Sequence, residues 1–580
     1  SSSRQPLLEP LFGFPSKCCW SSSMSPSLAV PQANLVQALV LLNIVALVAG
    51  ILPWKHDEWV RSSLSKPEAY SSSAGTKLPC SAPTPRAPVV FPEDLVVGND
   101  ADGLEMHSGY INVTEKDFLF YWFVRASSDA SQDAPVLIWS NGGPGCSAME
   151  GATTELGPLI MYMAKESGNR GFDYKLTKNP YAWNQKAHLL FVDQPRYVGY
   201  SCGTGSYTCS SKDAGLDMVT FIRGWRSLFP EIVNPKFILA SESYGGHYVP
   251  AWTNAILDHN DAAYDPIPLV GLAIGNGIVN DTVQNSDTFI EFAKRQGLIS
   301  QDSTPKTEGH ARRLIKKNLG YEPNYYDYRV EDLGSCCGCF SYNYTTWSYW
   351  LLRKAVTKAL NVCGDAGEKA FGGCAGGCIS FKGCRSGFDY KDAFDYSGAL
   401  NRALSLGINV TLFYGMQDTA CDYVGGYAMA STLAWAGAEQ WSAAPLEQLK
   451  IGGGMTGQIQ AAGGLTWIQV QGAGHMVPIN NAGAAFYALT TLLPGDGSAA
   501  SAPALPAART QAQQTRQGDV RRLKFLTKDV HIKAMGGAQS EEVDGLAFLQ
   551  TGARRRDHPP YLVDSVTAED PEGQREKEEL

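Results

Sequence analysis

The chain has 580 residues, of which 44% are hydrophobic and 18% are charged, values that are ordinary for a globular protein. This length allows several domains, although large α/β enzymes often run long as one. The formal net charge of −9 disfavours nucleic acid and anionic membrane surfaces as partners. Fourteen cysteines are many for a cytosolic enzyme, so the composition favours an oxidising compartment.

Residues 1–90 predict a leader and a linker. Within them, residues 35–52 are apolar apart from Gln37 and Asn43, which fits a signal peptide or a weak membrane anchor. A buried core helix is the alternative, but the position near the N-terminus and the Pro-rich flanks disfavour it. We expect a cleaved signal or a signal-anchor, followed by a linker or propeptide over residues 60–90.

Residues 496–580 predict a linker and a largely disordered tail, because they are rich in Ala, Pro and Gln and then in mixed charge. The tail ends in Lys577-Glu-Glu-Leu580, a variant of the Lys-Asp-Glu-Leu signal for retrieval to the endoplasmic reticulum. A charged end that only looks similar is the alternative. Without retrieval, we expect a vacuole- or lysosome-like compartment, or secretion.

Glycosylation sequons agree with a secretory route. Single sequons arise by chance, so their weight depends on the high cysteine content. The candidate acceptors are Asn112, Asn280, Asn343 and Asn409.

Residues 91–495 predict an α/β domain. Segments 108–113 and 118–124 predict a hairpin, and residues 465–470 alternate as a strand. Short apolar runs predict further strands at residues 136–139, 188–192, 237–240, 269–274 and 410–414. Helical patterns such as residues 214–229 lie between strands. Strands that alternate with helices imply a mostly parallel sheet with helices on both faces.

Residues 280–400 break this alternation and predict an insertion that caps the sheet. They contain seven of the fourteen cysteines. The spacing does not repeat the paired Cys-x-x-Cys pattern of zinc sites, and His310 is the only nearby histidine. Disulfides are therefore favoured over a metal, and their connectivity stays open. The cysteines are Cys336, Cys337, Cys339, Cys363, Cys374, Cys378 and Cys384.

The stretch from Phe237 to Pro250 predicts a nucleophile elbow. A short buried strand leads into the sharp turn Ser241-Glu-Ser-Tyr-Gly245, and helix-compatible residues follow. In an elbow, such a turn points the hydroxyl of its central serine, here Ser243, out of the sheet. An ordinary strand–turn–helix with a buried serine explains this stretch equally well until catalytic partners are found.

Asp418 and His475 follow Ser243 in the chain order of the α/β-hydrolases, and each stands just after a predicted strand. A serine hydroxyl is a poor nucleophile until an imidazole takes its proton. A carboxylate then fixes the imidazole tautomer and stabilises the imidazolium. The other downstream histidines do not follow a strand in a Gly-rich loop; they are His247, His259, His310, His531 and His558. The pattern therefore predicts a Ser243–His475–Asp418 triad.

A tetrahedral intermediate also needs hydrogen-bond donors for its oxyanion. The Gly-rich turn Trp139-Ser-Asn-Gly-Gly-Pro-Gly-Cys-Ser147 is a candidate source, although backbone geometry alone also explains its glycines. This turn, the Glu-Ser-Tyr elbow with His-Tyr-Val-Pro, the Gly275-Asn-Gly277 turn and Gly474-His-Met-Val-Pro478 together resemble the serine carboxypeptidases. The resemblance runs from about residue 95 to about residue 495, with several long motifs in the same order.

The resemblance implies an α/β-hydrolase with a Cys-rich cap insertion, acting as an exopeptidase on peptide and protein C-termini without a cofactor or metal. It implies that Ser243 is the nucleophile, His475 the base and Asp418 its orienting acid. The backbone amides of Gly143 and Tyr244 would form the oxyanion hole.

The resemblance also implies how the substrate is recognised. Asn141, Glu155 and Glu242 would bind the substrate's C-terminal carboxylate, because a protonated glutamate donates a hydrogen bond whereas an ionised one repels. Cys421 matches a cysteine found near the active site in part of the family. We interpret it as a structural or free thiol and expect it outside the site.

Three segments depart from the family pattern. Ser241 replaces a Gly, which is expected to strain the elbow slightly. The turn Pro195-Arg-Tyr-Val-Gly-Tyr-Ser201, followed by Cys202 and Cys209, lacks a usual Gly and leaves the shape of the substrate subsites open. The segment from Ile479 to Gly483 replaces an acidic or amide residue plus Pro, so some loss of precision around His475 is expected.

The triad alone leaves three functions open. A serine carboxypeptidase is the leading interpretation. An acyltransferase of the same fold, with an acyl-glucose donor, would use the same acyl-enzyme. A non-catalytic or chaperone-like relative is the third possibility, and the intact triad disfavours it.

Overall fold

The computed structural model describes residues 80, 83–127, 133–164, 173–262, 265–332, 347, 350–364, 392–451 and 454–493. The apolar segment 35–52, the tail after residue 493 and the sequon at Asn343 lie outside these residues. Among the helices that are described, none is both long and apolar enough to cross a membrane.

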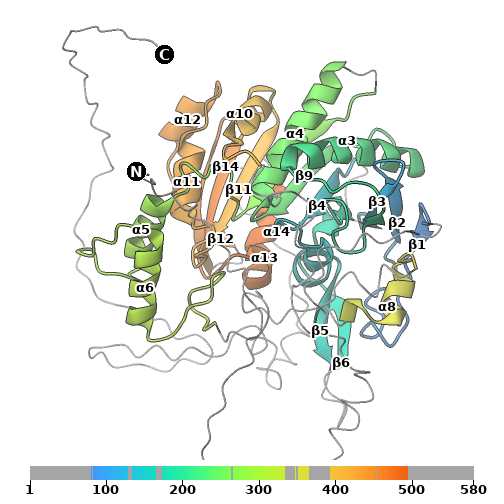
Figure 1. Cartoon of the computed structure of the whole chain (residues 1–580), viewed down its shortest axis with the longest axis horizontal. Helices are drawn as coiled ribbons and strands as arrows, with labels where there is room; N and C mark the ends of the chain where they lie inside the picture. Colours follow the sequence, from blue (N-terminus) through green and yellow to red (C-terminus); the bar gives the residue numbers. More distant parts are fainter. Residues whose placement is uncertain are drawn as a thin grey trace, which may run out of the picture. The chain divides into compact units, whose positions relative to one another are not determined.

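A mixed sheet forms the centre of the fold (Figure 1). Within the described residues it has twelve strands in the order β1-β2-β3-β7-β4-β9-β10-β11-β14-β13-β12, with β8 paired to β3. In this order, the successive pairs from β7 to β14 are parallel, whereas the pairs on either side of them are antiparallel. The α/β prediction of a mostly parallel sheet is confirmed.

The strands of this sheet are β1 (Ala87–Pro88), β2 (Met106–Asn112), β3 (Asp117–Val124), β4 (Val136–Ser140), β7 (His188–Val192), β8 (Cys202–Gly203), β9 (Phe237–Glu242), β10 (Leu269–Gly275), β11 (Asn409–Gly415), β12 (Glu447–Ile451), β13 (Gly454–Ala462) and β14 (Leu465–Val470). A separate antiparallel pair consists of β5 (Leu159–Ala164) and β6 (Asp173–Lys178).

The helices are α3 (Ser211–Leu228), α4 (Gly245–Ala262), α5 (Ser286–Arg295), α6 (Glu308–Leu319), α8 (Lys354–Ala359), α10 (Ser397–Ser405), α11 (Tyr423–Ser431), α12 (Ala438–Ala443), α13 (Val477–Asn480) and α14 (Ala482–Thr490). The described residues also form a π-helical turn, η1 (Gly151–Glu155), and a 3₁₀ turn, η3 (Trp183–Gln185).

The central strands are mostly apolar because both of their faces are buried. Successive side chains of a strand point to opposite faces. In β4, Val136 and Ile138 belong to one hydrophobic core, which includes residues of α3 and α4. Leu137 and Trp139 belong to a second core, which includes residues of η1 and α14. Helices therefore cover both faces of the sheet.

The predicted hairpin and the predicted apolar strands are all present, with ends that differ by a few residues. The elbow strand continues past Ala240 to Glu242, because Ser241 and Glu242 still pair with Ile274 and Gly275 of β10. The helix expected at residues 214–229 begins earlier, at Ser211, where the side chain of Ser210 accepts a hydrogen bond from the backbone N–H of Asp213 and caps the helix.

The region expected to form a cap insertion, residues 280–400, contains α5, α6 and α8 among its described residues. Of its seven cysteines, only Cys363 lies within the described residues, so the expectation of disulfides there stays a prediction. Elsewhere, Cys80 and Cys202 form a disulfide whose Cα atoms are 5.8 Å apart. This bond joins the segment before β1 to β8.

Candidate active site

Ser243 lies on the sharp turn between β9 and α4, as the elbow requires. Its φ angle of 60° is in the left-handed region, which is uncommon for a residue with a side chain. Three backbone hydrogen bonds hold the turn: Ser243 donates to the carbonyl of Gly275 at 3.0 Å, and its own carbonyl accepts from Gly246 at 3.0 Å and Ile278 at 3.1 Å. The strained serine is therefore fixed by β10 and by its own helix.

Ser241 does not leave an unsatisfied group in the elbow. Its side chain is buried, and its hydroxyl donates to the carbonyl of Ser140 in the neighbouring strand β4 at 2.5 Å. Gly245 is required opposite it, because an added Cβ there would lie 2.1 Å from Ser241 Oγ. Ser241 thus adds a hydrogen bond between two strands, and the absence of a side chain at Gly245 leaves space for its hydroxyl.

Asp418 and His475 form a buried pair at the ends of β11 and β14. His475 Nδ1 and Asp418 Oδ2 are 2.7 Å apart, and both side chains are almost completely inaccessible to solvent. Asp418 Oδ2 also accepts hydrogen bonds from Asn276 Nδ2 at 2.8 Å and from the backbone N–H of Cys421 at 3.1 Å. The carboxylate is thereby held on one side of the imidazole, while His475 Nε2 has no hydrogen-bond partner among the described residues.

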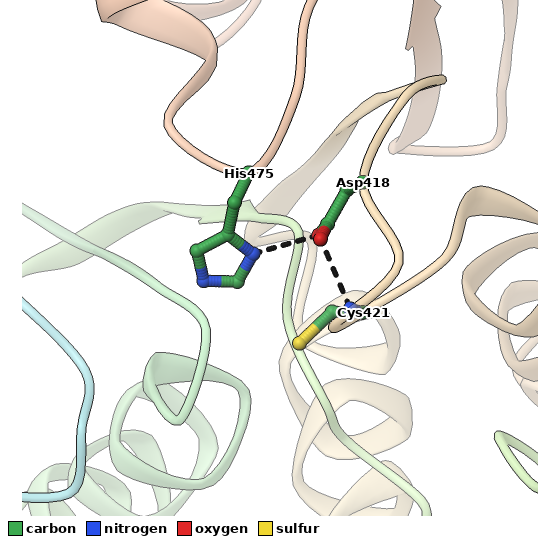
Figure 2. A group of neighbouring side chains, drawn as sticks. All are labelled: Asp418, Cys421 and His475. Atoms are coloured by element: carbon green, nitrogen blue, oxygen red, sulfur yellow. Dashed lines mark hydrogen bonds and ion pairs between the residues drawn. The ribbon is translucent and has the colours of Figure 1, made fainter. Parts of the chain in front are cut away.

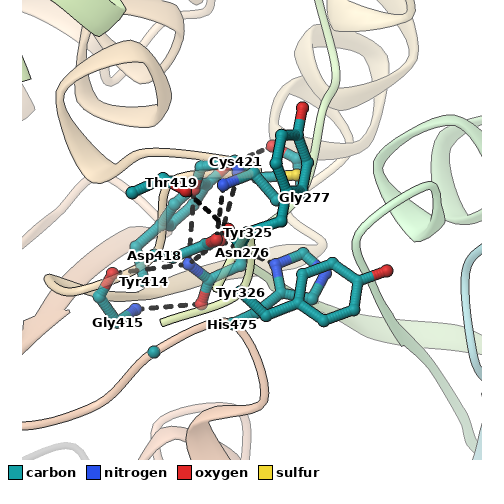
Figure 3. Close-up of polar contacts among 12 residues, drawn as sticks. Asn276, Gly277, Tyr325, Tyr326, Tyr414, Gly415, Asp418, Thr419, Cys421 and His475 are labelled. Carbon is teal, nitrogen blue, oxygen red and sulfur yellow. Dashed lines mark hydrogen bonds and ion pairs between the residues drawn. The ribbon is translucent and has the colours of Figure 1, made fainter. Parts of the chain in front are cut away.

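The loop that carries His475 is supported on both sides. Gly474 donates from its backbone to Asn480 Oδ1 at 2.8 Å, and the backbone N–H of His475 donates to the carbonyl of Tyr326 at 2.8 Å. The rings of Tyr326 and His475 stack at 4.3 Å with an interplanar angle of 7° (Figure 3). Asn480, one of the residues that depart from the family pattern, therefore supplies a hydrogen-bond acceptor that supports this loop.

Cys421 lies inside the site, which corrects the expectation that it stands apart. Asp418, Cys421 and His475 each offer an atom within 4.8 Å of the others, and Figure 2 shows the three side chains together. Burial, followed by the charges of Asp418 and Asp422, raises the pKa of the Cys421 thiol well above its ordinary value, against a hydrogen bond with Ser243. The thiol is therefore neutral.

These three side chains could in principle hold a soft metal ion. However, the Asp418 oxygen nearest to His475 is already occupied by three hydrogen bonds. We therefore interpret the cluster as an acid–base pair beside a thiol.

The Gly-rich turn lies directly against the elbow. A Cβ added to Gly142 would be 2.5 Å from the carbonyl oxygen of Glu242 and 2.6 Å from the backbone nitrogen of Tyr244. The next residue, Gly143, has a φ of 115°, a conformation that favours glycine. The turn therefore packs through Gly142 against the backbone of Tyr244. Gly143 and Tyr244 are the two residues predicted to supply the oxyanion hole.

Asn141, Glu155 and Glu242 come together in a buried cluster. Asn141 Nδ2 is 3.0 Å from Glu155 Oε1 and 3.0 Å from Glu242 Oε1. Its Oδ1 accepts from Trp139 Nε1 at 2.8 Å and from the backbone N–H of Gly151 at 3.0 Å, which fixes the orientation of the amide. The residue that follows β4, the last residue of η1 and the last residue of β9 thus meet in one place.

Both glutamates of this cluster have raised pKa values. Burial is the main cause for Glu155, and hydrogen bonds from Asn141 and with Glu242 oppose it. Burial also raises the pKa of Glu242 well above its ordinary value, and the charges of Glu155 and Glu150 add to it. Because two buried carboxylates cannot both ionise at close range without a large cost, the pair retains a proton at neutral pH.

Sequence reasoning missed two supporting residues. Asn276 has a φ of 38°, and it bridges loops by donating to Asp418 and by accepting from the backbone N–H of Gly415 at 2.9 Å. It lies in the Gly-Asn-Gly turn that the sequence analysis used as a motif without a role. Glu150 is buried beside the glutamate pair, and no sequence pattern distinguished it.

The altered turn after β7 is held by side chains in place of a glycine. Tyr197 has a φ of 72°, and its hydroxyl donates to Asp117 Oδ1 at 2.6 Å. Arg196 donates to both oxygens of Asp217, at 2.8 and 2.6 Å. These contacts with the start of β3 and with α3 fix a conformation that is otherwise costly for a residue with a side chain.

The described glycosylation candidates differ in exposure. Asn112 and Asn409 are exposed, so both stay predictions. Asn280 is buried, and its Oδ1 accepts from the hydroxyl of Thr282 at 2.5 Å. A glycan cannot be accommodated on Asn280 in this conformation.

Comparison with known proteins agrees with this architecture. The serine carboxypeptidase family matches residues 98–319 and 321–495. Carboxypeptidase Y homolog A of Arthroderma otae is 28% identical over 439 residues, which cover 68% of this chain and 75% of the relative. Its counterpart from Trichophyton tonsurans is 29% identical over 455 residues, with 71% and 77% covered.

The fold is also found among solved structures. A prohormone-processing carboxypeptidase from Saccharomyces cerevisiae has a TM-score of 0.55 at 22% identity, covering 70% of this chain and 95% of that one. Because the family match spans more than half of the chain and the fold agrees with it, the chain belongs to the serine carboxypeptidase family and is a serine-type peptidase.

Proposed function

We propose that Ser243 is the nucleophile that carries this carboxypeptidase activity, with His475 as its base and Asp418 as the acid that orients the base. The observation that supports it best is the buried Asp418–His475 contact of 2.7 Å. Ser243 stands on the sharp turn between β9 and α4, with a φ of 60°, the position at which an α/β-hydrolase presents its nucleophile. An imidazole that donates from Nδ1 to a carboxylate leaves Nε2 free to accept a proton.

In the proposed reaction, Ser243 Oγ attacks the carbonyl carbon of the last peptide bond while His475 Nε2 takes the hydroxyl proton. The backbone amides of Gly143 and Tyr244 donate to the oxyanion that forms. His475 then gives the proton to the leaving amine, and the C-terminal residue departs. A water molecule, activated by the same imidazole, hydrolyses the acyl-enzyme.

We further propose that Asn141, Glu155 and Glu242 select substrates with a free C-terminal carboxylate. The amide of Asn141 and a protonated glutamate can each donate a hydrogen bond to that carboxylate. The raised pKa values of both glutamates support this proposal, because they favour the protonated, donating form.

Replacement of the nucleophile tests this proposal. Ser243→Ala should lower kcat by a factor on the order of 10⁴ to 10⁶ and should abolish labelling by a fluorophosphonate probe, with an unchanged melting temperature. A variant that keeps a tenth of the wild-type activity would show that another residue is the nucleophile.

An acyltransferase of the same fold remains the alternative function. It would use the same acyl-enzyme, and therefore a donor-dependent transfer assay, run beside peptide hydrolysis, separates the two. Transfer from an acyl-glucose donor without peptide hydrolysis would favour the acyltransferase. Failure of the probe to label Ser243 in the wild type would favour a non-catalytic, chaperone-like relative.

We propose a secretory-pathway location, in a vacuole- or lysosome-like compartment or outside the cell. The Cys80–Cys202 disulfide and the exposed sequons at Asn112 and Asn409 support it, since structural disulfides persist in oxidising compartments.

A further inference from the structure

His247 lies in the first turn of α4, next to the elbow, and the mechanism above gives it no role. Its side chain is buried between two carboxylates: Nδ1 is 3.5 Å from Asp392 Oδ2, and Nε2 is 3.8 Å from Asp281 Oδ1. Burial alone would lower the pKa of His247, but the two carboxylates outweigh it and raise the pKa. This environment favours the doubly protonated, cationic ring.

Asp392 connects this cation to the residue that follows the nucleophile. The hydroxyl of Tyr244 donates to Asp392 Oδ2 at 2.8 Å, the same oxygen that faces His247. The ring of Tyr244 lies against the imidazole, with centroids 4.4 Å apart. Tyr244 is therefore held at its hydroxyl and at its ring by the two members of one buried ion pair.

The carboxylate itself is firmly placed. Ser211, the first residue of α3, donates to Asp392 from its backbone at 3.1 Å and from its hydroxyl, and the Tyr396 hydroxyl donates to the other oxygen. Burial would raise the pKa of Asp392, but His247, Ser211 and Tyr396 outweigh it and lower the pKa. Asp392 is thus an ionised, oriented acceptor for Tyr244.

The two carboxylates that face His247 come from segments that are far apart in the sequence. Asp281 follows β10, whereas Asp392 precedes α10, and the backbone N–H of Asp281 donates to the carbonyl of Phe394 at 2.8 Å. Among the described residues, the titratable side chains that face His247 are Tyr244, Asp281, Asp392 and Tyr396. Loss of the imidazolium charge would leave two carboxylates around a neutral ring, which is unfavourable in a buried site.

We propose that the His247–Asp392 ion pair is a positioning device for Tyr244, which keeps the Tyr244 backbone amide aligned with the oxyanion of the transition state. Neither His247 nor Asp392 needs to touch the substrate for this role. The inference rests on the oxyanion role proposed above for Tyr244. As the pH rises through the raised pKa of His247, the ring loses its charge, the hold on Tyr244 weakens, and kcat falls.

Steady-state kinetics with a peptide amide as substrate tests this device, because such a substrate lacks the free carboxylate that Glu155 and Glu242 are proposed to bind. Tyr244→Phe removes the hydrogen bond to Asp392 and should lower kcat about tenfold, the effect of one hydrogen bond to a charged group, with little change in KM. His247→Gln should lower kcat by a similar factor and remove the alkaline fall of kcat. The double variant should be no worse than the more damaging single variant, because both break the same chain of contacts.

Tyr427→Phe is the matched control. It also removes a tyrosine hydroxyl that makes one hydrogen bond, here to Gln460 Oε1 at 2.8 Å, and it should leave kcat unchanged. Wild-type kcat in Tyr244→Phe, or an alkaline fall of kcat that persists in His247→Gln, would overturn the inference. If His247→Gln does not fold, Tyr244→Phe alone decides. Retained activity in Ser243→Ala would instead overturn the proposed function, so the two failures are distinguishable.

Discussion

Glu155 and Glu242 lie in one buried cluster, and we propose that their protonation determines whether a substrate carboxylate is attracted or repelled. Their pKa values are raised, chiefly by burial, so the pair holds a proton in acidic to neutral solution and loses it as the pH rises. For peptides with a free C-terminus, KM should therefore increase above this transition by up to about tenfold per pH unit, since one proton is required for binding. The expected activity optimum is acidic to neutral, because His475 must be neutral to act as the base.

Glu155→Gln and Glu242→Gln should each flatten this pH dependence of KM for free-acid peptides. For peptide amides, which lack the carboxylate that this pair is proposed to bind, neither substitution should have a comparable effect. Glu439→Gln removes an exposed carboxylate of α12 and controls for the change in net charge. Identical KM–pH curves for free-acid and amide substrates in the wild type would rule out carboxylate recognition by this pair.

Among single residues, the sequence analysis identified the catalytic candidates that lie in recognisable motifs. It did not identify the residues that support them from other parts of the chain. Ser243, Asp418 and His475 could be selected because chain order and strand ends restrict the choice. Asn276 supports Asp418 across 142 residues, and Asp392 binds Tyr244 across 148 residues. No local pattern indicates such contacts, because they depend on how distant loops meet.

Among the elements, the Gly-rich turn and the elbow are packed so closely that only a hydrogen fits between them. Gly142→Ala would place a Cβ 2.5 Å from a backbone oxygen and 2.6 Å from a backbone nitrogen, and backbone atoms cannot yield as a flexible side chain can. We expect the turn to shift and kcat to fall on the order of a hundredfold, since small misplacements at a reacting centre have effects of that size.

Gly398→Ala provides the control for this prediction. Gly398 is in α10, and nothing lies within 4 Å of the Cβ that alanine would add. In a helix, this change should leave kcat unchanged and the melting temperature equal or higher. A Gly142→Ala variant with the kcat of Gly398→Ala would show that the turn does not need this close approach.

Strands were predictable from sequence where both faces are buried, and less so elsewhere. β4 and β9 have every residue buried, which produces continuous apolar runs such as Val136-Leu-Ile-Trp139. β12 has one buried residue among five, and β1 has only two residues and includes a Pro. Such edge strands contain few apolar residues, because much of their surface is exposed to solvent. The sequence therefore predicts them poorly.

For the molecule as a whole, the Cys80–Cys202 bond links the segment before the sheet to its edge across 122 residues. In the chain-entropy account, closing a loop of this length stabilises the fold by about 4 to 5 kcal/mol, mainly by restricting the unfolded chain. Cys80→Ser should therefore lower the free energy of unfolding by several kcal/mol, as measured by denaturant titration under oxidising conditions, and Cys80→Ser/Cys202→Ser should match it. Equal stability of wild type and Cys80→Ser would show that the bond contributes nothing.

The boundaries of the folded part were only partly predictable. The domain was expected to begin at residue 91, but Ala87 of β1 already pairs with Ser108 of β2, and the Cys80 disulfide lies earlier still. The β1–β2 pairing and the Cys80–Cys202 disulfide both join residues that are distant in the sequence. The Pro-rich sequence before residue 91 predicts a linker, because it gives no local sign of these interactions. The expected boundary at residue 495 stays a prediction.

The central claim is that this chain removes residues one at a time from peptide C-termini through Ser243. The most direct measurement is incubation with a panel of peptides of known sequence, read by mass spectrometry over time, with Ser243→Ala as the control. We predict ladders shortened only from the C-terminus, slower for C-terminal amides at acidic pH and absent with Ser243→Ala. Internal cleavage, shortening from the N-terminus, or ladders that persist in Ser243→Ala would contradict the claim.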